Sequence, residues 1–412
     1  MNKGRLRIVL YSHDTMGIGH MRRNQLIAQT LARPPREADI LMIAGAREAN
    51  AFVMPPGVDC LTLPSLRKGK DGCYKPRCLN VSLEELGALR TKVIGAAMEA
   101  FKPDVLIVDK VPRGAVRELD PILEDLRTQG LTRCVLGLRD VLDDPDTVRR
   151  EWRNAANEEA IERYYDAIWV YGDRSVYDPV SEYRLPSGLA AKVRYTGYLD
   201  RHVRAEEAEA EDMAPLPDLA LPPGRLVLCM VGGGQDGARL AEAFVDAELP
   251  PETNAVVMTG PFMPTEVRNR LRRLAAARPR LRVLEFVTGP EPLLSRADRV
   301  IAMGGYNTVC EVLSYEKHAL IVPRVEPRRE QLVRVERLRE LGLLDFLHPD
   351  EVGPEALAGW LARDLGPPPR VRDRVDLNGL ARLPGLLDEV IAAPPRTRRG
   401  RSRGGAVEHV SS

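Results

Sequence analysis

The chain has 412 residues, of which 44% are apolar and 29% are charged. This length favours two domains, because single cores seldom grow beyond roughly 250–300 residues. The 60 basic and 59 acidic residues nearly cancel, and five arginines after Pro394 leave the rest of the chain slightly acidic. This balance excludes a globally basic nucleic-acid binder.

Other features of the composition favour a cytoplasmic protein. No apolar run reaches the roughly 20 residues of a membrane helix. The strand-like segment Leu6–Tyr11 comes too early to leave room for a secretory signal. Six scattered cysteines predict no disulfide framework and fit a reducing compartment.

Short apolar strands alternate with helices along the first 200 residues. The strands expected here are Arg5–Tyr11, Ile40–Ala44, Val105–Val108, Cys134–Leu138 and Ile168–Tyr171, and the helices are Arg22–Ala32 and Leu83–Ala100. Continuous apolar strands separated by helices are typical of a parallel sheet that is covered on both faces.

A change of composition interrupts this pattern, which then restarts. The acidic stretch Ala205–Asp212 and the prolines that follow it predict an exposed linker. The strands expected after it are Leu226–Val231, Ala255–Thr259, Leu281–Leu284, Arg299–Ala302 and Ala319–Val322, and the helices are Gly237–Ala247, Gln331–Leu341, Pro354–Arg363 and Leu380–Ala392. We therefore predict an α/β protein in which two Rossmann-like, doubly wound domains face each other across a cleft.

The domain boundaries follow from these patterns. We expect a first, acceptor-side domain at residues 1–200, a linker at 201–223 and a second, donor-binding domain at 224–370. A C-terminal helix within 371–393 is expected to pack back on the first domain. Residues 394–412 form an Arg-rich tail that is too polar to pack and is expected to be disordered.

The first glycine-bearing turn follows the first strand and includes Gly17, Gly19 and His20. Glycines at a strand-to-helix turn permit close ligand approach, and the helix start directs free N–H groups at the crevice where open α/β sheets bind ligands. The imidazole of His20 can take a proton from an acceptor hydroxyl near neutral pH. The alternative interpretation is a tight turn with a structural histidine.

A second glycine turn, Gly232–Gly237, again stands between a strand and a helix. It has the form G-x-G-x-x-G of a dinucleotide fingerprint, but the next strand ends at Thr259 without the acid that would hold a ribose. NAD chemistry is therefore disfavoured. Gly233, Gly234 and Gln235 stay candidates for phosphate binding, and a plain tight turn is the alternative.

The third turn combines several signals between Ala302 and Glu311. Gly304 and Gly305 let the chain turn tightly, while Asn307 and Thr308 can cap the following helix and donate to phosphate oxygens. Glu311 lies about one helical turn further in, within reach of a sugar hydroxyl pair. An ordinary exposed glutamate is the alternative for Glu311.

The order Thr308-Val309-Cys310-Glu311, Pro323 and Gln331 resembles the nucleotide-sugar-binding half of GT-B glycosyltransferases, and most of all glycosyltransferase family 28. The resemblance covers about 140 residues of the second domain and the first glycine turn. It implies that Glu311 holds the ribose hydroxyls, that Gln331 contacts the donor sugar and that the turn from Gly304 to Thr308 surrounds the diphosphate.

The same resemblance implies two further features. Phe286 and Val287 lie where the family's backbone meets a uracil ring. The opening Ser12-His13-Asp14-Thr15-Met16-Gly17 is similar to that of a set of uncharacterised bacterial predicted glycosyltransferases, a likeness that identifies no acceptor.

The chain departs from the family pattern at Arg328 and Arg334, where the peptidoglycan member of the family has Asp and Asn. The donor sugar is therefore open, and the two arginines can pair with a carboxylate or another phosphate. Arg139 and Asp140 end a strand at the same sheet edge as His20, so we expect them to contact the acceptor or to orient the base.

Two lesser motifs predict no metal site. The spacing Asp144-Pro145-Asp146 is that of metal-dependent transferases, but an Asp-Pro pair also starts helices, and the following residues favour a helix. Cys73 and Cys78 are too few for a zinc site. They lie in a lysine- and arginine-rich loop that we interpret as a basic acceptor loop.

The sequence thus predicts a metal-independent glycosyltransferase with no bound cofactor. It would move a hexose or N-acetylhexosamine from a nucleotide sugar, with UDP as the expected nucleotide, to an unidentified acceptor hydroxyl on a lipid-linked molecule or a small glycan. We expect no nucleic-acid partner and at most peripheral contact with the inner face of the membrane. A nucleotide-sugar 2-epimerase and a non-catalytic nucleotide-sugar sensor are the alternatives.

Overall fold

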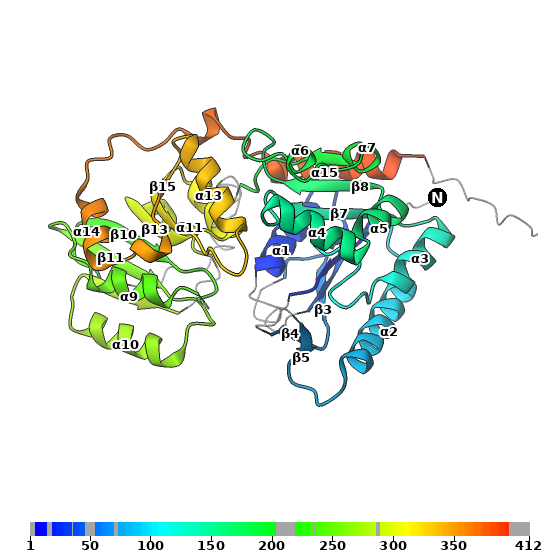
Figure 1. Cartoon of the computed structure of the whole chain (residues 1–412), viewed down its shortest axis with the longest axis horizontal. Helices are drawn as coiled ribbons and strands as arrows, with labels where there is room; N and C mark the ends of the chain where they lie inside the picture. Colours follow the sequence, from blue (N-terminus) through cyan, green and yellow to red (C-terminus); the bar gives the residue numbers. More distant parts are fainter. Residues whose placement is uncertain are drawn as a thin grey trace, which may run out of the picture.

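The computed structural model describes residues 5–14, 19–34, 36–45, 54–69, 73–200, 202, 219–234, 236–285 and 289–394. Two lobes lie side by side, each built on its own sheet (Figure 1). Every pairing within these two sheets is parallel. The predicted fold of two Rossmann-like α/β domains is confirmed.

The first sheet has seven strands in the order β3-β2-β1-β6-β7-β8-β9. Its strands are β1 (Arg7–Ser12), β2 (Asp39–Ala44), β3 (Val58–Thr62), β6 (Val105–Asp109), β7 (Arg133–Arg139), β8 (Ala167–Tyr171) and β9 (Val193–Tyr195). The helices of this lobe are α1 (Gly19–Leu31), α2 (Leu83–Phe101), α3 (Asp120–Gln129), α4 (Pro145–Ala155), α5 (Asn157–Tyr164), α6 (Pro179–Glu182) and α7 (Ser187–Ala190). The lysine- and arginine-rich loop forms an antiparallel hairpin of β4 (Leu66–Lys68) and β5 (Tyr74–Pro76).

The second sheet has six strands in the order β12-β11-β10-β13-β14-β15. Its strands are β10 (Arg225–Met230), β11 (Thr253–Met258), β12 (Leu281–Leu284), β13 (Arg299–Met303), β14 (His318–Val322) and β15 (Asp345–Phe346). Its helices are α9 (Ala238–Asp246), α10 (Thr265–Ala276), α11 (Glu291–Arg296), α12 (Tyr306–Ser314), α13 (Glu330–Glu340) and α14 (Pro354–Ala362), with the 3₁₀ turns η2 (Pro349–Glu351) and η3 (Val371–Asp373).

Local sequence explains several of these boundaries. Ser82 and Glu85 form a reciprocal capping box at the start of α2. The carboxylate of Asp144 accepts from the backbone N–H of Thr147 and caps α4, so the Asp-Pro-Asp motif does start a helix. The interior strands β6 and β8 are buried along their whole length, which explains their uninterrupted apolar sequence.

The last helix, α15 (Gly379–Ala392), returns to the first lobe, where it packs against α1 (Figure 1). Leu199 forms an isolated bridge with Asn378 just before this helix. One continuous apolar cluster runs from β1 and α1 through Tyr198 and Tyr306 into α12 and α15. The two lobes therefore share buried surface next to the site described below. No described helix is long and apolar enough to cross a membrane.

Candidate active site

A pocket, here called the junction pocket, lies where the carboxyl edges of the two sheets face each other. Its wall includes Gly19 and His20 from the start of α1, Gly232–Gly234 after β10 and Gly305 after β13. Strand order reverses between β1 and β6 in the first sheet and between β10 and β13 in the second. Open α/β sheets bind ligands at such reversals, so the pocket is formed by two binding crevices that share one space.

His20 is held by a carboxylate that ends the neighbouring strand. Its Nδ1 lies 2.5 Å from Oδ2 of Asp109, the last residue of β6. Arg23, one turn further along α1, contacts both oxygens of the same carboxylate, with the shortest distance 2.5 Å. The carboxylate of Asp109 is fully buried. The guanidinium of Arg23 neutralises its charge, and the same carboxylate orients the imidazole of His20.

The protonation state of this trio follows from its surroundings. Arg23 and His20 hold the pKa of Asp109 far below its usual range, so this group is a carboxylate that can only accept hydrogen bonds. We therefore assign the proton to Nδ1 of His20, which leaves the lone pair on Nε2. Burial lowers the pKa of His20 to about 4, so the ring is neutral at pH 7 and able to accept a proton.

The turn after β10 brings glycine backbone to the pocket. Gly232 and Gly234 have φ of 62° and 87°, a region that favours glycine. A Cβ atom at Gly234 would lie 2.1 Å from the carbonyl oxygen of Thr259. Gly233 and Gly234, the candidates for phosphate binding, line the pocket. Gln235, and likewise Gly17, Phe286 and Val287, lie outside the described residues.

The turn after β13 differs from the prediction in its cap. The N-cap of α12 is Gly305, and no side chain caps it, so the expectation that Asn307 and Thr308 cap this helix is wrong. Both residues already lie within the first turn of α12, because the helix starts at Tyr306. They line the pocket, and the Asn307 amide donates instead to the backbone oxygen of Gly19 across the junction, at 3.0 Å.

The two glycines of this turn have different surroundings. A Cβ at Gly304 would meet Val335, Gln331 and Pro323 at 3.1–3.3 Å, so Gly304 lets α13 approach and is not part of the pocket wall. A Cβ at Gly305 would meet nothing within 4 Å. Gly305 thus presents the unobstructed start of α12 to the pocket, a place suited to an anion.

Glu311 is fully buried within α12 and is not an ordinary exposed glutamate. Its Oε1 accepts from the guanidinium of Arg22 on α1, at 2.8 Å. Arg22 lines the junction pocket and Glu311 does not. A ribose that reaches Glu311 must therefore displace or share this contact between the two domains.

Asp140 also lies behind the pocket wall. Its carboxylate accepts from Arg334 at 2.6 Å and from the hydroxyl of Tyr198 at 2.8 Å, and both charged side chains are fully buried. The guanidinium of Arg334 lies 5.6 Å from the ring centroid of Tyr306. Asp140 thus joins the two domains, whereas its strand neighbour Arg139 lines the pocket.

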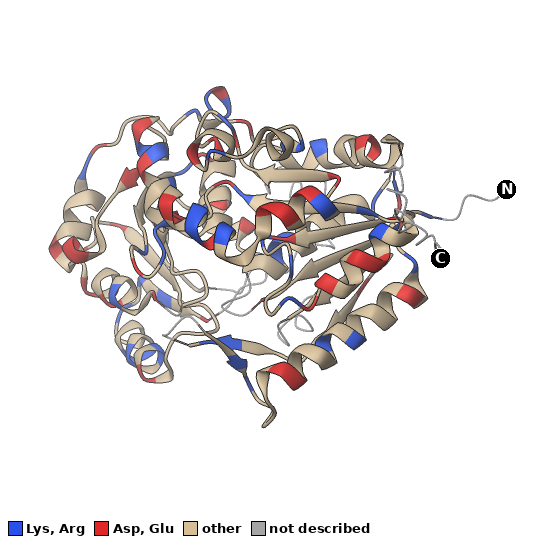
Figure 2. Ribbon diagram, turned by 45° about the vertical axis from the view of Figure 1, so that its right-hand side comes forward, with Lys and Arg blue, Asp and Glu red and all other residues tan. Residues whose placement is uncertain are grey.

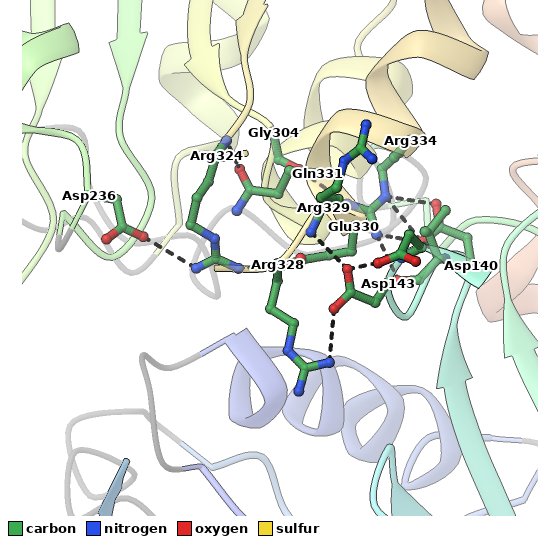
Figure 3. Close-up of polar contacts among 12 residues, drawn as sticks. Asp140, Asp143, Asp236, Gly304, Arg324, Arg328, Arg329, Glu330, Gln331 and Arg334 are labelled. Carbon is green, nitrogen blue, oxygen red and sulfur yellow. Dashed lines mark hydrogen bonds and ion pairs between the residues drawn. The ribbon is translucent and has the colours of Figure 1, made fainter. Parts of the chain in front are cut away.

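Around α13 the arginines that depart from the family pattern are paired with carboxylates of the first domain (Figure 3). Arg328 contacts Asp143 at 2.9 Å and Glu151 at 2.7 Å, and the backbone N–H of Arg329 donates to Asp143. Arg328 and Arg334 therefore hold the domains together by ion pairs with carboxylates of this chain.

Gln331, for which a donor-sugar contact is predicted, lines the pocket. Its side-chain oxygen accepts from the backbone N–H of Arg324, at 3.0 Å (Figure 3). The Arg324 guanidinium contacts Glu330 at 2.5 Å and Asp236 at 3.3 Å. This fixed orientation leaves the amide nitrogen of Gln331 as the donor available to a ligand.

Sequence reasoning missed several residues of this site. Asp109 ends a buried strand at the same edge as His20, a position that predicts proximity, and Arg23 stands three residues after His20, on the same face of α1. The pairing of Arg22 with Glu311 joins residues 289 positions apart, and no local pattern indicates it. Among the described residues no group of three His, Cys, Asp or Glu side chains could hold a metal ion.

Comparison with known proteins agrees with this geometry. Residues 227–365 match the model of the glycosyltransferase family 28 C-terminal domain. The chain is 29% identical over 130 residues to the UDP-N-acetylglucosamine–N-acetylmuramyl-(pentapeptide) pyrophosphoryl-undecaprenol N-acetylglucosamine transferase of Sulfurihydrogenibium sp. (strain YO3AOP1), across 31% of this chain and 35% of that protein. It is 28% identical over 204 residues to an uncharacterised glycosyltransferase of Methanosarcina acetivorans, across 48% of each. The matches thus span less than half the length of these relatives.

Solved structures match nearly the whole chain. The calicheamicin glycosyltransferase CalG4 superposes with a TM-score of 0.60 at 16% identity, over 95% of this chain and 100% of that one. A Listeria monocytogenes protein described as a UDP-N-acetylglucosamine 2-epimerase superposes with a TM-score of 0.59 at 13% identity, over 94% and 97%. The second domain of this chain thus matches the family 28 C-terminal domain, and the whole chain has the GT-B fold.

Proposed function

We propose that this protein is a metal-independent glycosyltransferase that moves a hexose or N-acetylhexosamine from a UDP-sugar to an acceptor hydroxyl, with inversion at the anomeric carbon. The observation that carries the proposal is the shared junction pocket. It combines a neutral histidine held by a buried carboxylate with two glycine turns of a family 28 domain. The first domain then supplies the base and the second domain binds the donor.

In this reaction His20 Nε2 takes the proton of the acceptor hydroxyl as its oxygen attacks the anomeric carbon. The bond from that carbon to the β-phosphate oxygen breaks, and UDP leaves with the electron pair. Backbone N–H groups of Gly232 and Gly233 and those at the start of α12 can stabilise the growing charge, because oriented dipoles act strongly in a site shielded from water. The N–H of Gly234 already donates to the backbone oxygen of Val231. Asp109 stabilises the imidazolium that forms.

Resemblance to family 28 supports the remaining assignments. Glu311 would hold the ribose hydroxyls after displacement of Arg22, and Gln331 would donate to the sugar. The acceptor is a lipid-linked molecule or a small glycan, and we place the protein in the cytoplasm, with at most peripheral contact to a membrane.

Calorimetry tests the donor half of the proposal. UDP and UDP-hexoses should bind in the presence of EDTA, and labelled UDP-sugar incubated with cell extract should transfer its label to a product. His318→Ala serves as a control for His20→Ala. His318 is the first residue of β14 and therefore lies at the amino edge of the second sheet, whereas the pocket lies at the carboxyl edge. Absence of UDP binding, or binding only with added Mg²⁺, would contradict the proposal.

A 2-epimerase is the second candidate, because a protein described as such shares the fold. Three carboxylates, those of Asp236, Glu285 and Glu330, do line the pocket, more than the motifs predicted. However, each is paired with an arginine, which leaves none as an unpaired base. Conversion of UDP-N-acetylglucosamine to its 2-epimer without extract would support the epimerase. UDP-sugar binding with neither transfer nor conversion would support the sensor.

A further inference from the structure

The first-domain wall of the junction pocket carries a cation that this chain does not neutralise. Four arginines line the pocket. Arg22, Arg23 and Arg324 are each paired with a carboxylate. Arg139 makes no ion pair or hydrogen bond through its guanidinium within the described part of the chain, and its Nε is buried without a partner.

Lys110 is a second cation without a partner among the described residues, and it follows the last residue of the adjacent strand β6. It does not itself line the pocket. It directly follows Asp109, the partner of His20, and its backbone N–H donates to Gly137 of β7 at 2.8 Å. Its φ of 67° is one that residues other than glycine seldom adopt. The residue is half-buried, and its ammonium group makes no ion pair or hydrogen bond with any described residue. Strained backbone of this kind is found preferentially at functional positions.

The surroundings of Lys110 and Arg139 disfavour the charged form of both side chains as long as no anion is bound. Burial, followed by the charges of Arg139 and Arg328, lowers the pKa of Lys110 to about 7. The pKa of Arg139 is lowered by burial and by the neighbouring guanidinium groups of Arg334 and Arg23. A half-buried cation among other cations gains most from an added anion.

Carboxylates of this chain face the same region but are already engaged. The charged groups that act on Lys110 are Asp109 of β6, Arg139 of β7, and Arg328 and Glu330 of the segment that opens α13, and Lys110 in turn acts on His13 and His20. Asp109 is bound to Arg23, and Oε1 of Glu330 to Arg324. The other oxygen of Glu330 has no hydrogen-bond partner in the described structure, but it belongs to the second domain, across the pocket.

We propose that Lys110 and Arg139 form an anion subsite for the acceptor, so that the acceptor carries a phosphate or carboxylate group close to the hydroxyl that receives the sugar. This inference rests on the proposed function, since it takes His20 as the base. Lys110 adjoins Asp109, the residue that holds His20. Arg139 and His20 both line the pocket. The donor diphosphate belongs to the glycine turns of the opposite domain, which supply backbone N–H groups for it.

Calorimetry with inorganic phosphate tests the subsite on the full chain saturated with UDP. Phosphate should bind to the UDP complex of the wild type, with uptake of protons as Lys110 becomes charged, seen as a dependence of the heat on the buffer. Lys110→Met and Arg139→Gln should each weaken this binding by about tenfold or more, the loss expected for a hydrogen bond to a charged group. Acetate in place of phosphate distinguishes a carboxylate acceptor from a phosphorylated one.

Lys102→Met is the matched control. Lys102 also has a positive φ, 49°, but it is exposed at the end of α2, so phosphate binding should not change. Arg139→Lys, which keeps the charge, should retain part of the binding. The affinity for UDP should stay within about twofold in all four variants, which also reports that they are folded.

Three outcomes would overturn the subsite: no phosphate binding to the UDP complex, displacement of UDP by phosphate, or equal binding by wild type, Lys110→Met and Arg139→Gln. If UDP itself fails to bind, the proposed function is wrong, and the same titration without nucleotide still decides whether the two cations bind an anion. In cell extract the labelled product should bind an anion-exchange resin, and a neutral product would contradict an anionic acceptor.

Discussion

The two walls of the junction pocket are built from different chemistry. The first-domain wall is a network of charged side chains in which His20, Asp109 and Arg23 lie within hydrogen-bond distance of one another. The second-domain wall presents glycine backbone at Gly232–Gly234 and Gly305. The charged side chains on that wall, Asp236, Glu285, Arg324 and Glu330, are all engaged in ion pairs within the second domain. Figure 2 shows lysines and arginines on both lobes, so the difference is local to the pocket and does not reflect the overall charge.

This difference assigns different tasks to the two walls. A proton acceptor needs a side chain whose pKa the surroundings can shift, and such control requires charged neighbours. A diphosphate leaving group needs many weak donors held in place, which backbone N–H groups supply without a counterion. Changes on the first wall should therefore affect turnover, and changes on the second wall should affect nucleotide affinity.

The largest effect is expected from His20→Ala. Loss of a general base lowers turnover by about 10²–10⁴-fold, while the affinity for UDP should stay within about twofold because His20 belongs to the first-domain wall. Release of UDP from a labelled UDP-sugar in the presence of cell extract measures the first quantity, and calorimetry measures the second. Unchanged turnover would remove His20 as the base, and a parallel loss of UDP affinity would break the division between the walls.

A large effect on stability is expected where the walls are joined. Arg334→Met leaves the buried carboxylate of Asp140 without a cation, held only by the hydroxyl of Tyr198 and the backbone N–H of Val141. Loss of one partner from a buried ion pair costs about 3–5 kcal/mol. Arg337→Met on the same helix removes partly exposed ion pairs with Glu182 and Glu340, and pairs of this kind are worth about 0–1 kcal/mol each. Urea denaturation of both variants checks this, and equal losses would show that the buried pair does not hold the junction.

The sequence predicted the glycine turns of both walls better than the short strands of the first domain. Each glycine turn was located from sequence, because strand, glycine and helix follow one another within about ten residues. The expected strand Arg299–Ala302 corresponds to β13, which extends one residue further. β3 and the β4–β5 hairpin were missed, since their short strands are only partly buried and carry a weak apolar pattern.

The side-chain pairing across the junction was not predictable from sequence. Asp140 and Arg334 are separated by 194 positions, and their meeting depends on how two complete domains dock. Asp140 was expected at the acceptor side because it ends a strand, yet the side chain packs behind the wall and Arg139 lines the pocket instead. Strand ends predict the edge of a sheet, but alternation along the strand decides which side chain reaches the ligand.

A moderate effect is expected from Glu311→Gln on the second wall. If the carboxylate holds the ribose hydroxyls, the wild type should bind UDP about tenfold more tightly than 2′-deoxy-UDP, as expected for a hydrogen bond to a charged group. Glu311→Gln should remove most of this preference, whereas Glu340→Gln at the exposed end of α13 should keep it. Equal preference in all three proteins would place the ribose elsewhere and leave Glu311 with a structural role as a partner of Arg22.

The smallest change near neutral pH is expected in kcat/KM, whose pH dependence should report the titration of His20 and of Lys110 on the first-domain side. The base must be neutral, and the pKa of His20 is lowered to about 4, so the rate should fall only as pH drops towards 4 and not at the ordinary histidine value near 6.5. The acceptor subsite needs charged Lys110, whose pKa is lowered to about 7, so the rate should also fall as pH rises through about 7. Because kcat/KM reports the free enzyme, Lys110→Met should abolish the basic limb and keep the acidic one. An acidic limb near 6.5 would mean that His20 is not buried against Asp109 in the active protein, and an unchanged basic limb in Lys110→Met would assign that limb to another group.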